Sequence, residues 1–251
     1  MGTINSDKSW KAYGKKNAYF GVLTHDEYLD ENLSIENKKK FFATGQKHVE
    51  HTLKLISQKL DTNFSPKNAL DFGCGTGRIS LAFARKGITT TGIDVSSDMI
   101  EEAKSNAIEQ QILNVNFYIS DDQLASIKGR EFDLINSYIV LQHINIERGL
   151  NIFKLLLNSL SKNGVGVVQF TYRSNKPKTV KIANYFRYRI PLVNVIMNVL
   201  KGNSARQPLM QMNAYNLNTI YAVLQEHGIQ NTYQELEKHG DFWGVTIYFQ
   251  N

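Results

Sequence analysis

Apolar side chains along the chain follow two spacings, which predict helices and strands in alternation. Val49, Leu53, Ile56 and Leu60 recur at helical spacing, so we expect a helix over residues 46–60. Helices with similar patterns are expected after Arg78, after Asp98, and over 145–160 and 216–227. Short apolar runs predict strands at 69–72, 89–94, 114–119, 132–138, 165–171, 231–236 and 242–249.

This alternation predicts an α/β fold in which helices cover both faces of a mostly parallel sheet. A chain of 251 residues fits one such domain, which we place at 46–251. Residues 1–45 precede it as an N-terminal arm, which is either loosely packed or a lid over the ligand site. Residues 172–212 are surplus to the repeating pattern and form an insertion between a strand and the last helix.

Composition narrows the class of protein. Nothing resembles a signal peptide, and the apolar runs are far shorter than the roughly 18 residues of a membrane span. The single cysteine, Cys74, excludes an internal disulfide and favours a reducing, cytoplasmic location. The six histidines show no metal-ligand spacing, so we expect no metal.

The net charge of +6 is unevenly distributed. From Arg148 to Gln225 the chain has eleven Lys and Arg and no acid, whereas the remainder has 18 basic and 23 acidic residues. A block of one sign suggests an anionic partner or surface. The alternative is that these basic residues face acidic residues from the rest of the chain.

A glycine-rich loop follows the first strand, in the stretch 69–78 with the sequence ALDFGCGTGR. Glycines let the backbone turn sharply and approach a ligand. A phosphate-binding P-loop would need Lys-Ser/Thr where Arg78 stands, and a dinucleotide fingerprint would need a small residue there. The pattern D-x-G-x-G-x-G remains, with Asp71 suited to a ligand that carries an ammonium group.

This loop, together with a second strand that ends at Asp94, resembles the first two motifs of class I S-adenosylmethionine (SAM)-dependent methyltransferases. The resemblance covers about residues 66–250. It implies a Rossmann-like seven-stranded sheet of order 3-2-1-4-5-7-6 whose last strand is antiparallel. It also implies SAM as the cofactor and S-adenosylhomocysteine (SAH) as the product.

The resemblance assigns residues to the parts of SAM. Asp71 would meet the methionine ammonium and Asp94 the ribose. Adenine would contact Val95 and Met99, and its amino group would meet Asp121 or, if the register shifts by one, Asp122. The full set implied for the cofactor is Asp71, Gly73, Cys74, Gly75, Thr76, Gly77, Asp94, Val95, Met99, Asp121, Asp122, Gln123, Ser137 and Tyr138.

The acceptor side is less defined. The fourth strand lacks the N/D-P-P-Y/F motif that marks many enzymes methylating planar nitrogens, which lowers that class. His143 is the one histidine near the expected cleft, so it is a candidate general base, with a purely structural histidine as the alternative. Candidate residues on the acceptor side are Tyr19, Arg173, Arg187 and Arg189.

The resulting hypothesis is a cytoplasmic SAM-dependent methyltransferase that acts on an oxygen or nitrogen of a small molecule or saccharide, with an anionic acceptor as one option. The insertion would form a helical cap, and its basic side could meet a phosphate, a carboxylate or an anionic membrane surface. An RNA or protein methyltransferase is one alternative, although no recognised RNA-binding module is present. A non-catalytic SAM-binding protein is another.

Overall fold

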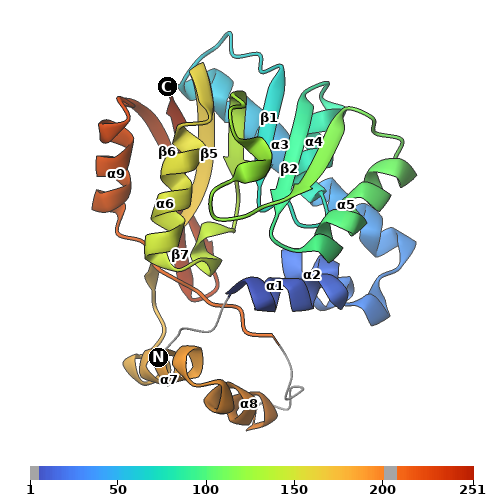
Figure 1. The fold of residues 1–251 in the computed structure, drawn as a ribbon, viewed down its shortest axis with the longest axis vertical. Coiled ribbons are helices and arrows are strands. Elements are labelled where there is room, and N and C mark those ends of the chain that lie inside the picture. Colours follow the sequence, from blue (N-terminus) through green and yellow to red (C-terminus); the bar gives the residue numbers. More distant parts are fainter. Residues whose placement is uncertain (1–5, 201–207) are drawn as a thin grey trace.

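The computed structural model describes residues 6–200 and 208–251, and its centre is a seven-stranded sheet (Figure 1). The strand order is β3-β2-β1-β4-β5-β7-β6, as predicted. Neighbouring pairs from β3 to β5 are parallel, whereas β7 runs antiparallel to both β5 and β6. The strands are β1 (Asn68–Phe72), β2 (Thr89–Asp94), β3 (Val115–Ile119), β4 (Phe132–Ser137), β5 (Leu160–Ser174), β6 (Asn231–His239) and β7 (Phe242–Gln250).

The helices expected between the strands are present, and the described part of the N-terminal arm and of the insertion is helical as well. The α-helices are α1 (Ser6–Lys15), α2 (Ala18–Val22), α3 (Ile35–Lys59), α4 (Arg78–Arg85), α5 (Ser97–Glu109), α6 (Ile146–Leu157), α7 (Lys178–Arg189), α8 (Pro191–Leu200) and α9 (Leu217–Glu226). Short 3-10 turns are η1 (Asp26–Tyr28), η2 (Asp30–Asn32), η3 (Ala125–Ile127) and η4 (Leu141–His143).

Several of the expected element boundaries were wrong; the fifth strand spans Leu160–Ser174 rather than 165–171, and the helix before it ends at Leu157 rather than at residue 160. The helix predicted at 46–60 begins at Ile35, because Ser34 caps it by accepting a hydrogen bond from the Asn37 N–H, and Phe41 and Phe42 extend its buried face. The fourth strand ends at Ser137 rather than at residue 138. Ile139 has a positive φ of 61°, which a β-branched residue rarely adopts, and this breaks the strand direction before η4.

The central strands β1, β4, β5 and β7 are buried on both faces over most of their length, whereas the edge strands β3 and β6 are largely exposed. Consecutive residues of a strand point to opposite faces, and Leu134 and Ile135 accordingly belong to different hydrophobic clusters. Ile135 packs with α6 and α9, whereas Leu134 packs with α3 and α4. Strands buried on both sides read as continuous apolar runs, which is why the sequence pattern located them well.

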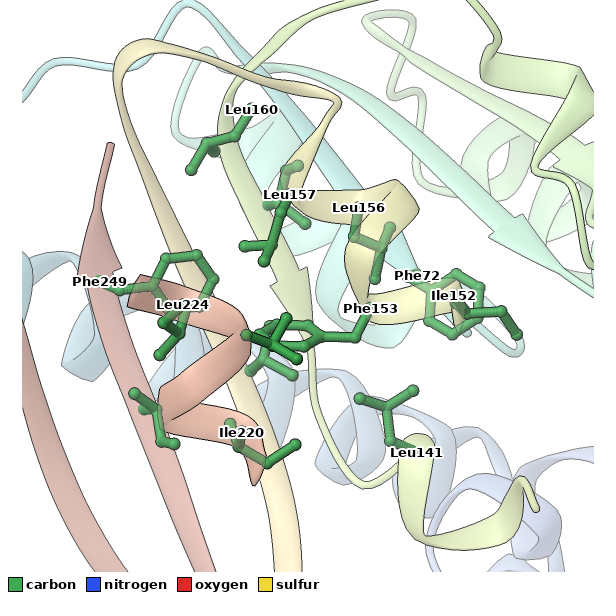
Figure 2. Packing of buried hydrophobic residues seen from close by; sticks show 14 of the residues in the cluster. Phe72, Leu141, Ile152, Phe153, Leu156, Leu157, Leu160, Ile220, Leu224 and Phe249 are labelled. Atoms are coloured by element: carbon green, nitrogen blue, oxygen red, sulfur yellow. The ribbon is translucent and has the colours of Figure 1, made fainter. Parts of the chain in front are cut away.

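Phe153 of α6 lies at the centre of the larger cluster (Figure 2). Its ring is fully buried and meets the rings of Phe170 and Phe249 edge to face, with centroids 5.2 and 6.0 Å away. Both partners come from strands, β5 and β7. One aromatic side chain therefore holds α6 against the antiparallel side of the sheet.

We expect Phe153→Ala to lower the free energy of unfolding by about 3–5 kcal/mol, because it leaves a cavity where the ring packs. Urea unfolding followed by circular dichroism measures this. Leu113→Ala is the matched control, since Leu113 is 95% exposed and its truncation should cost less than about 0.5 kcal/mol. Equal losses in the two variants would contradict this account of the core.

Candidate functional site

A cavity of about 610 Å³ opens at the carboxyl ends of the parallel strands. In open α/β sheets ligands bind at this edge, where the strand order reverses on either side of the first strand. Here β1 lies between β2 and β4, so the loop after β1 is placed at the reversal. The cavity walls come from this loop, the ends of β2 and β4, α1 and α2, the stretch around Met210, and the β6–β7 turn.

The glycine loop is shaped for close approach. Gly73, Gly75 and Gly77 all have positive φ, at 74°, 52° and 86°. A Cβ on Gly73 would come within 2.4 Å of Val140, and one on Gly75 within 2.6 Å of Val22. Only glycine fits this backbone. Gly73, Cys74 and Gly75 line the cavity, whereas Thr76 and Gly77 turn away from it into the start of α4.

Asp94 fixes the loop against β2. Its Oδ2 accepts the Gly75 N–H at 3.0 Å, and its Oδ1 accepts the Ser96 N–H at 2.9 Å. The carboxyl group lines the cavity, and burial raises its pKa to about 6. The two motifs that the sequence separates by about twenty residues are therefore joined by a direct hydrogen bond.

Asp71 is a second buried carboxyl group on the cavity wall. Its Oδ2 accepts from the Ser80 hydroxyl at 2.6 Å, and its Oδ1 accepts from the Asn136 side-chain amide at 2.8 Å. Burial raises its pKa even though both bonds favour the charged form. A cation in the cavity would offset this cost, since an opposite charge stabilises the ionised carboxylate.

Sequence reasoning gave Arg78 no role beyond excluding other loops. The side chain is 5% exposed and lines the cavity. Its Nη1 donates to the Thr44 hydroxyl at 3.2 Å, but its Nε–H finds no acceptor among the described residues. Burial lowers the pKa of Arg78, although Asp71 acts in the opposite direction. A buried guanidinium with an unused donor is costly, and an anionic ligand group would satisfy it.

His143 of η4 also lines the cavity. Its Nδ1–H donates to the Gln211 carbonyl at 2.7 Å, so Nε2 is the acceptor nitrogen and receives the Gln142 amide at 3.2 Å. Trp10 of α1 meets the imidazole edge to face, with centroids 4.9 Å apart. Burial lowers the pKa of His143 to about 4.

His143 is not alone, so the expectation of one histidine near the cleft was wrong. His25 and His239 also line the cavity. His25 directly precedes η1, and His239 is the last residue of β6. The sequence could not place either element beside the glycine loop. His48 of α3 packs its ring 4.3 Å from that of Tyr138, and burial lowers its pKa to about 4.

The structure does not bring the expected adenine acids to the cavity. Asp121 folds back, and its Oδ1 accepts the N–H groups of Gln123 and Ala125. Asp122 pairs with Arg148 on the surface. None of Asp121, Asp122 and Gln123 lines the cavity, whereas Ser120 does. Val95, Met99 and Tyr138 line it, and Ser137 is buried with a hydroxyl that has no hydrogen-bond partner among the residues that the structure describes.

The acceptor-side expectations need correction as well. Tyr19 is 3% exposed and does not line the cavity, because its hydroxyl bonds Glu102 and Asn106 of α5. Arg173 stacks over Trp243 at 5.0 Å. Arg187 donates to the asparagines of α8. The side chain of Arg189 lies outside the described part of the structure.

From the insertion, the residues that line the cavity are Met210 and Met212, which follow the two helices α7 and α8. From the arm they include Ser6, Asp7, Trp10, Val22 and Leu23. The sequence placed neither methionine at the site, because no short-range pattern marks them. Within the described residues, no cluster of three or more His, Cys, Asp or Glu side chains could hold a metal ion.

The environment of His143 predicts that its ring stays neutral from pH 8 to about pH 5. Its Hε1 NMR resonance, identified by its loss in His143→Gln, should not titrate in that range. The unfolded chain takes up this proton near pH 6.5, so lowering the pH from about 6.5 towards 4 should favour unfolding through this group. A titration midpoint near 6.5 in the folded protein would contradict the burial.

Comparison with known proteins identifies the central part of this chain. Residues 69–164 match the family model of the methyltransferase domain. A ubiquinone biosynthesis O-methyltransferase of Coxiella burnetii is 38% identical over 92 residues, which is 37% of this chain and 38% of that protein. A ribosomal protein L11 methyltransferase of Phocaeicola vulgatus is 28% identical over 142 residues, 51% of this chain and 49% of that protein. The chain therefore spans half or less of these curated relatives.

Solved structures extend the likeness to the whole fold. A magnesium protoporphyrin IX methyltransferase from Synechocystis with bound SAH superposes with a TM-score of 0.65 at 17% identity, covering 98% of this chain and all of that one. A Haemonchus contortus phosphoethanolamine N-methyltransferase superposes with a TM-score of 0.58 at 14% identity, over 80% of this chain and 52% of that one. Residues 69–164 of this chain are thus similar to the methyltransferase domain, and the fold as a whole is similar to that of solved methyltransferases.

Proposed function

We propose that the protein is a SAM-dependent methyltransferase that acts on a small-molecule acceptor. The observation that carries this proposal is the single cavity that runs from the glycine loop and Asp94 to Trp10, His143 and Met212. Its volume of about 610 Å³ lies within the range of pockets that hold small ligands. Methyl transfer needs donor and acceptor held in line, and one shared cavity provides that positioning.

The cofactor end fits SAM in charge and shape. SAM would supply a methyl group on a sulfonium, which leaves as neutral SAH. Asp94 has its two oxygens on backbone N–H groups and keeps further lone pairs for ribose hydroxyls. Asp71 would face the methionine ammonium, and Val95 and Met99 would pack against adenine. With Asp121 turned away, we assign recognition of the adenine edge to the region of Ser120.

Arg78 completes the cofactor end. We assign its guanidinium to the methionine carboxylate, because its unused Nε–H lies in a buried side chain of the cavity wall next to Asp71. Zwitterionic methionine would then place its ammonium by the acid and its carboxylate by the base. The two buried charges would each gain a partner, which removes the cost that each carries alone.

The acceptor end is more apolar. Trp10, Met210, Met212 and Phe242 line it, together with the polar side chains of Ser6, Asp7, Gln142 and His143. These walls favour an acceptor with a flat or apolar part, and saccharide rings also stack on tryptophan. For an oxygen acceptor, His143 could receive the hydroxyl proton at Nε2 once Gln142 turns aside. A neutral amine acceptor would need no base.

The alternatives differ in testable ways. An RNA or protein methyltransferase must admit a polymer, whereas α1 and α2 contribute to the walls of this cavity. Polynucleotide binding with a steep salt dependence would favour RNA. A non-catalytic SAM-binding protein would bind SAM but release no SAH with any acceptor of a broad panel of phenols, amines and sugars.

Calorimetry with SAM, SAH, NAD and ATP tests the proposal. We expect SAM and SAH to bind, and NAD and ATP to bind far more weakly, because the loop lacks the phosphate-binding patterns. Asp94→Ala should weaken SAM binding roughly 10- to 150-fold, the equivalent of losing a charged hydrogen bond. Glu101→Ala on α5 is the control with the same charge change. Preferential NAD binding, or an unchanged dissociation constant for Asp94→Ala, would contradict the assignment.

Arg78→Met tests the carboxylate assignment. We expect SAH affinity to fall about 10- to 150-fold, because a charge-assisted hydrogen bond is lost. Methylthioadenosine, which has the sulfur and nucleoside but no amino acid part, should bind within about twofold of wild type. Arg85→Met, at the other end of α4, should change neither ligand. A parallel loss for both ligands would show that Arg78 supports the loop and does not bind the carboxylate.

A further inference from the structure

Helix α8 exposes the face that a helix of a globular protein normally buries. Leu192, Val195, Ile196 and Val199 recur at i, i+3, i+4 and i+7, which places them on one stripe. Their exposed fractions are 66%, 38%, 50% and 58%. The segment Pro191–Leu200 contains no charged residue. Single exposed apolar side chains are ordinary, but a whole helical stripe of them marks an interaction surface.

The polar side of α8 is turned inward instead. Arg187 of α7 donates from Nε to Asn194 at 2.7 Å and from Nη2 to Asn198 at 2.5 Å. Asn198 is fully buried. The α7–α8 hairpin is therefore held together by a polar contact and shows its apolar surface outside. This arrangement is costly in water, so it calls for an apolar surrounding on the outer side.

Helix α7 adds aromatic and aliphatic side chains to the exposed surface. Ile182, Tyr185 and Phe186 are 59%, 50% and 48% exposed, and the two aromatic rings lie edge to face at 5.6 Å. Aromatic residues are favoured where a protein meets the boundary of a membrane. The sequence of α7 also holds Lys178, Lys181 and Arg189, and no acid lies between 149 and 225.

The hairpin stands apart from the sheet and beside the cavity. It follows β5, and Figure 1 shows α7 and α8 projecting beyond the edge of the sheet near which α1 and α2 lie. The chain that returns from it carries Met210 and Met212 into the cavity wall. A surface that binds α7 and α8 would therefore lie near the acceptor end of the site.

We propose that the α7–α8 hairpin docks the protein on the surface of an anionic membrane. The exposed apolar side chains would enter the boundary between head groups and acyl chains, and the net positive charge of the acid-free segment would favour an anionic lipid surface. No helix among the described residues is long and apolar enough to cross a bilayer, so the contact is peripheral. A second copy of the chain is a poorer occupant, because two acid-free hairpins would bring like charges together.

Flotation with lipid vesicles tests the proposal. Wild type should float with vesicles of about one part phosphatidylglycerol to two parts phosphatidylcholine, and should bind pure phosphatidylcholine at least about tenfold more weakly. Raising the salt concentration should weaken the anionic binding. This readout needs neither SAM nor an acceptor, so it stands or falls independently of the proposed methyltransferase activity.

Leu192→Ser/Ile196→Ser should reduce partitioning into anionic vesicles at least about tenfold without loss of folded structure, since both side chains are solvent-exposed. Ile108→Ser/Leu113→Ser is the matched control, because it removes two exposed apolar residues, at 79% and 95%, far from the hairpin. The proposal would be overturned if wild type stays in the bottom fraction and does not float with the anionic vesicles. Equal losses of vesicle binding in both variants would also overturn it. So would a dimer in size-exclusion chromatography that the hairpin variant converts to a monomer without changing vesicle binding.

Discussion

The hydrogen bond from the Gly75 N–H to Asp94 is the contact on which the site depends. A loop with three glycines at positive φ has little preference for one conformation, because glycine loses the most backbone entropy on folding. The carboxylate holds this loop and the start of α5 at once, through Gly75 and Ser96. It also brings β2 and the β1 loop together at the point where the strand order reverses. A ligand that bonds Asp94 would therefore meet a loop that is already in place.

Charge burial would favour a zwitterionic ligand beside the glycine loop. Asp71 is buried and Asp94 is partly buried, and desolvation is the largest cause of the raised pKa of each. Arg78 is buried beside them, and its pKa is lowered for the same reason. Such groups lower the stability of the empty protein. A ligand that carries both signs relieves the cost on both sides, which a neutral or singly charged ligand cannot do.

The sequence located the strands and the glycine loop well, because both depend on local signals, whereas the sheet order followed from the family resemblance. Buried strands read as apolar runs, and the glycine pattern has a specific backbone reason at each position. It failed where distant elements decide. Asp121 is an acid at the position where the family pattern expects one. Its carboxylate, however, accepts backbone N–H groups of its own loop in an Asx-type turn. Tyr19 was expected at the acceptor, but α5 offers Glu102 and Asn106 to its hydroxyl.

The basic block shows the same limit. Its residues looked alike in sequence, yet they have different roles in the structure. Arg148 forms ion pairs with Asp7 and Asp122. Pairing with acids from the rest of the chain was the alternative that the sequence left open. Arg187 instead joins two neutral asparagines, and that bond is what leaves the apolar stripe of α8 outside. Sequence gives the sign of a charge, but only the packing of the hairpin shows which surface the charge accompanies.

The helices that cover the cavity are held by packing as well as by charge. Near α2, Tyr19 is buried among Phe41 and Phe42 and bonded to α5, so opening there would expose a packed aromatic cluster. Near α1, Tyr13 belongs to the same cluster and donates its hydroxyl to the Pro208 carbonyl at 3.1 Å, and Asp7 pairs with Arg148. A partly exposed ion pair contributes about 0–1 kcal/mol, whereas a buried aromatic side chain contributes about 1.5–3 kcal/mol. The aromatic cluster therefore holds both helices over the cavity more strongly than the ion pair does.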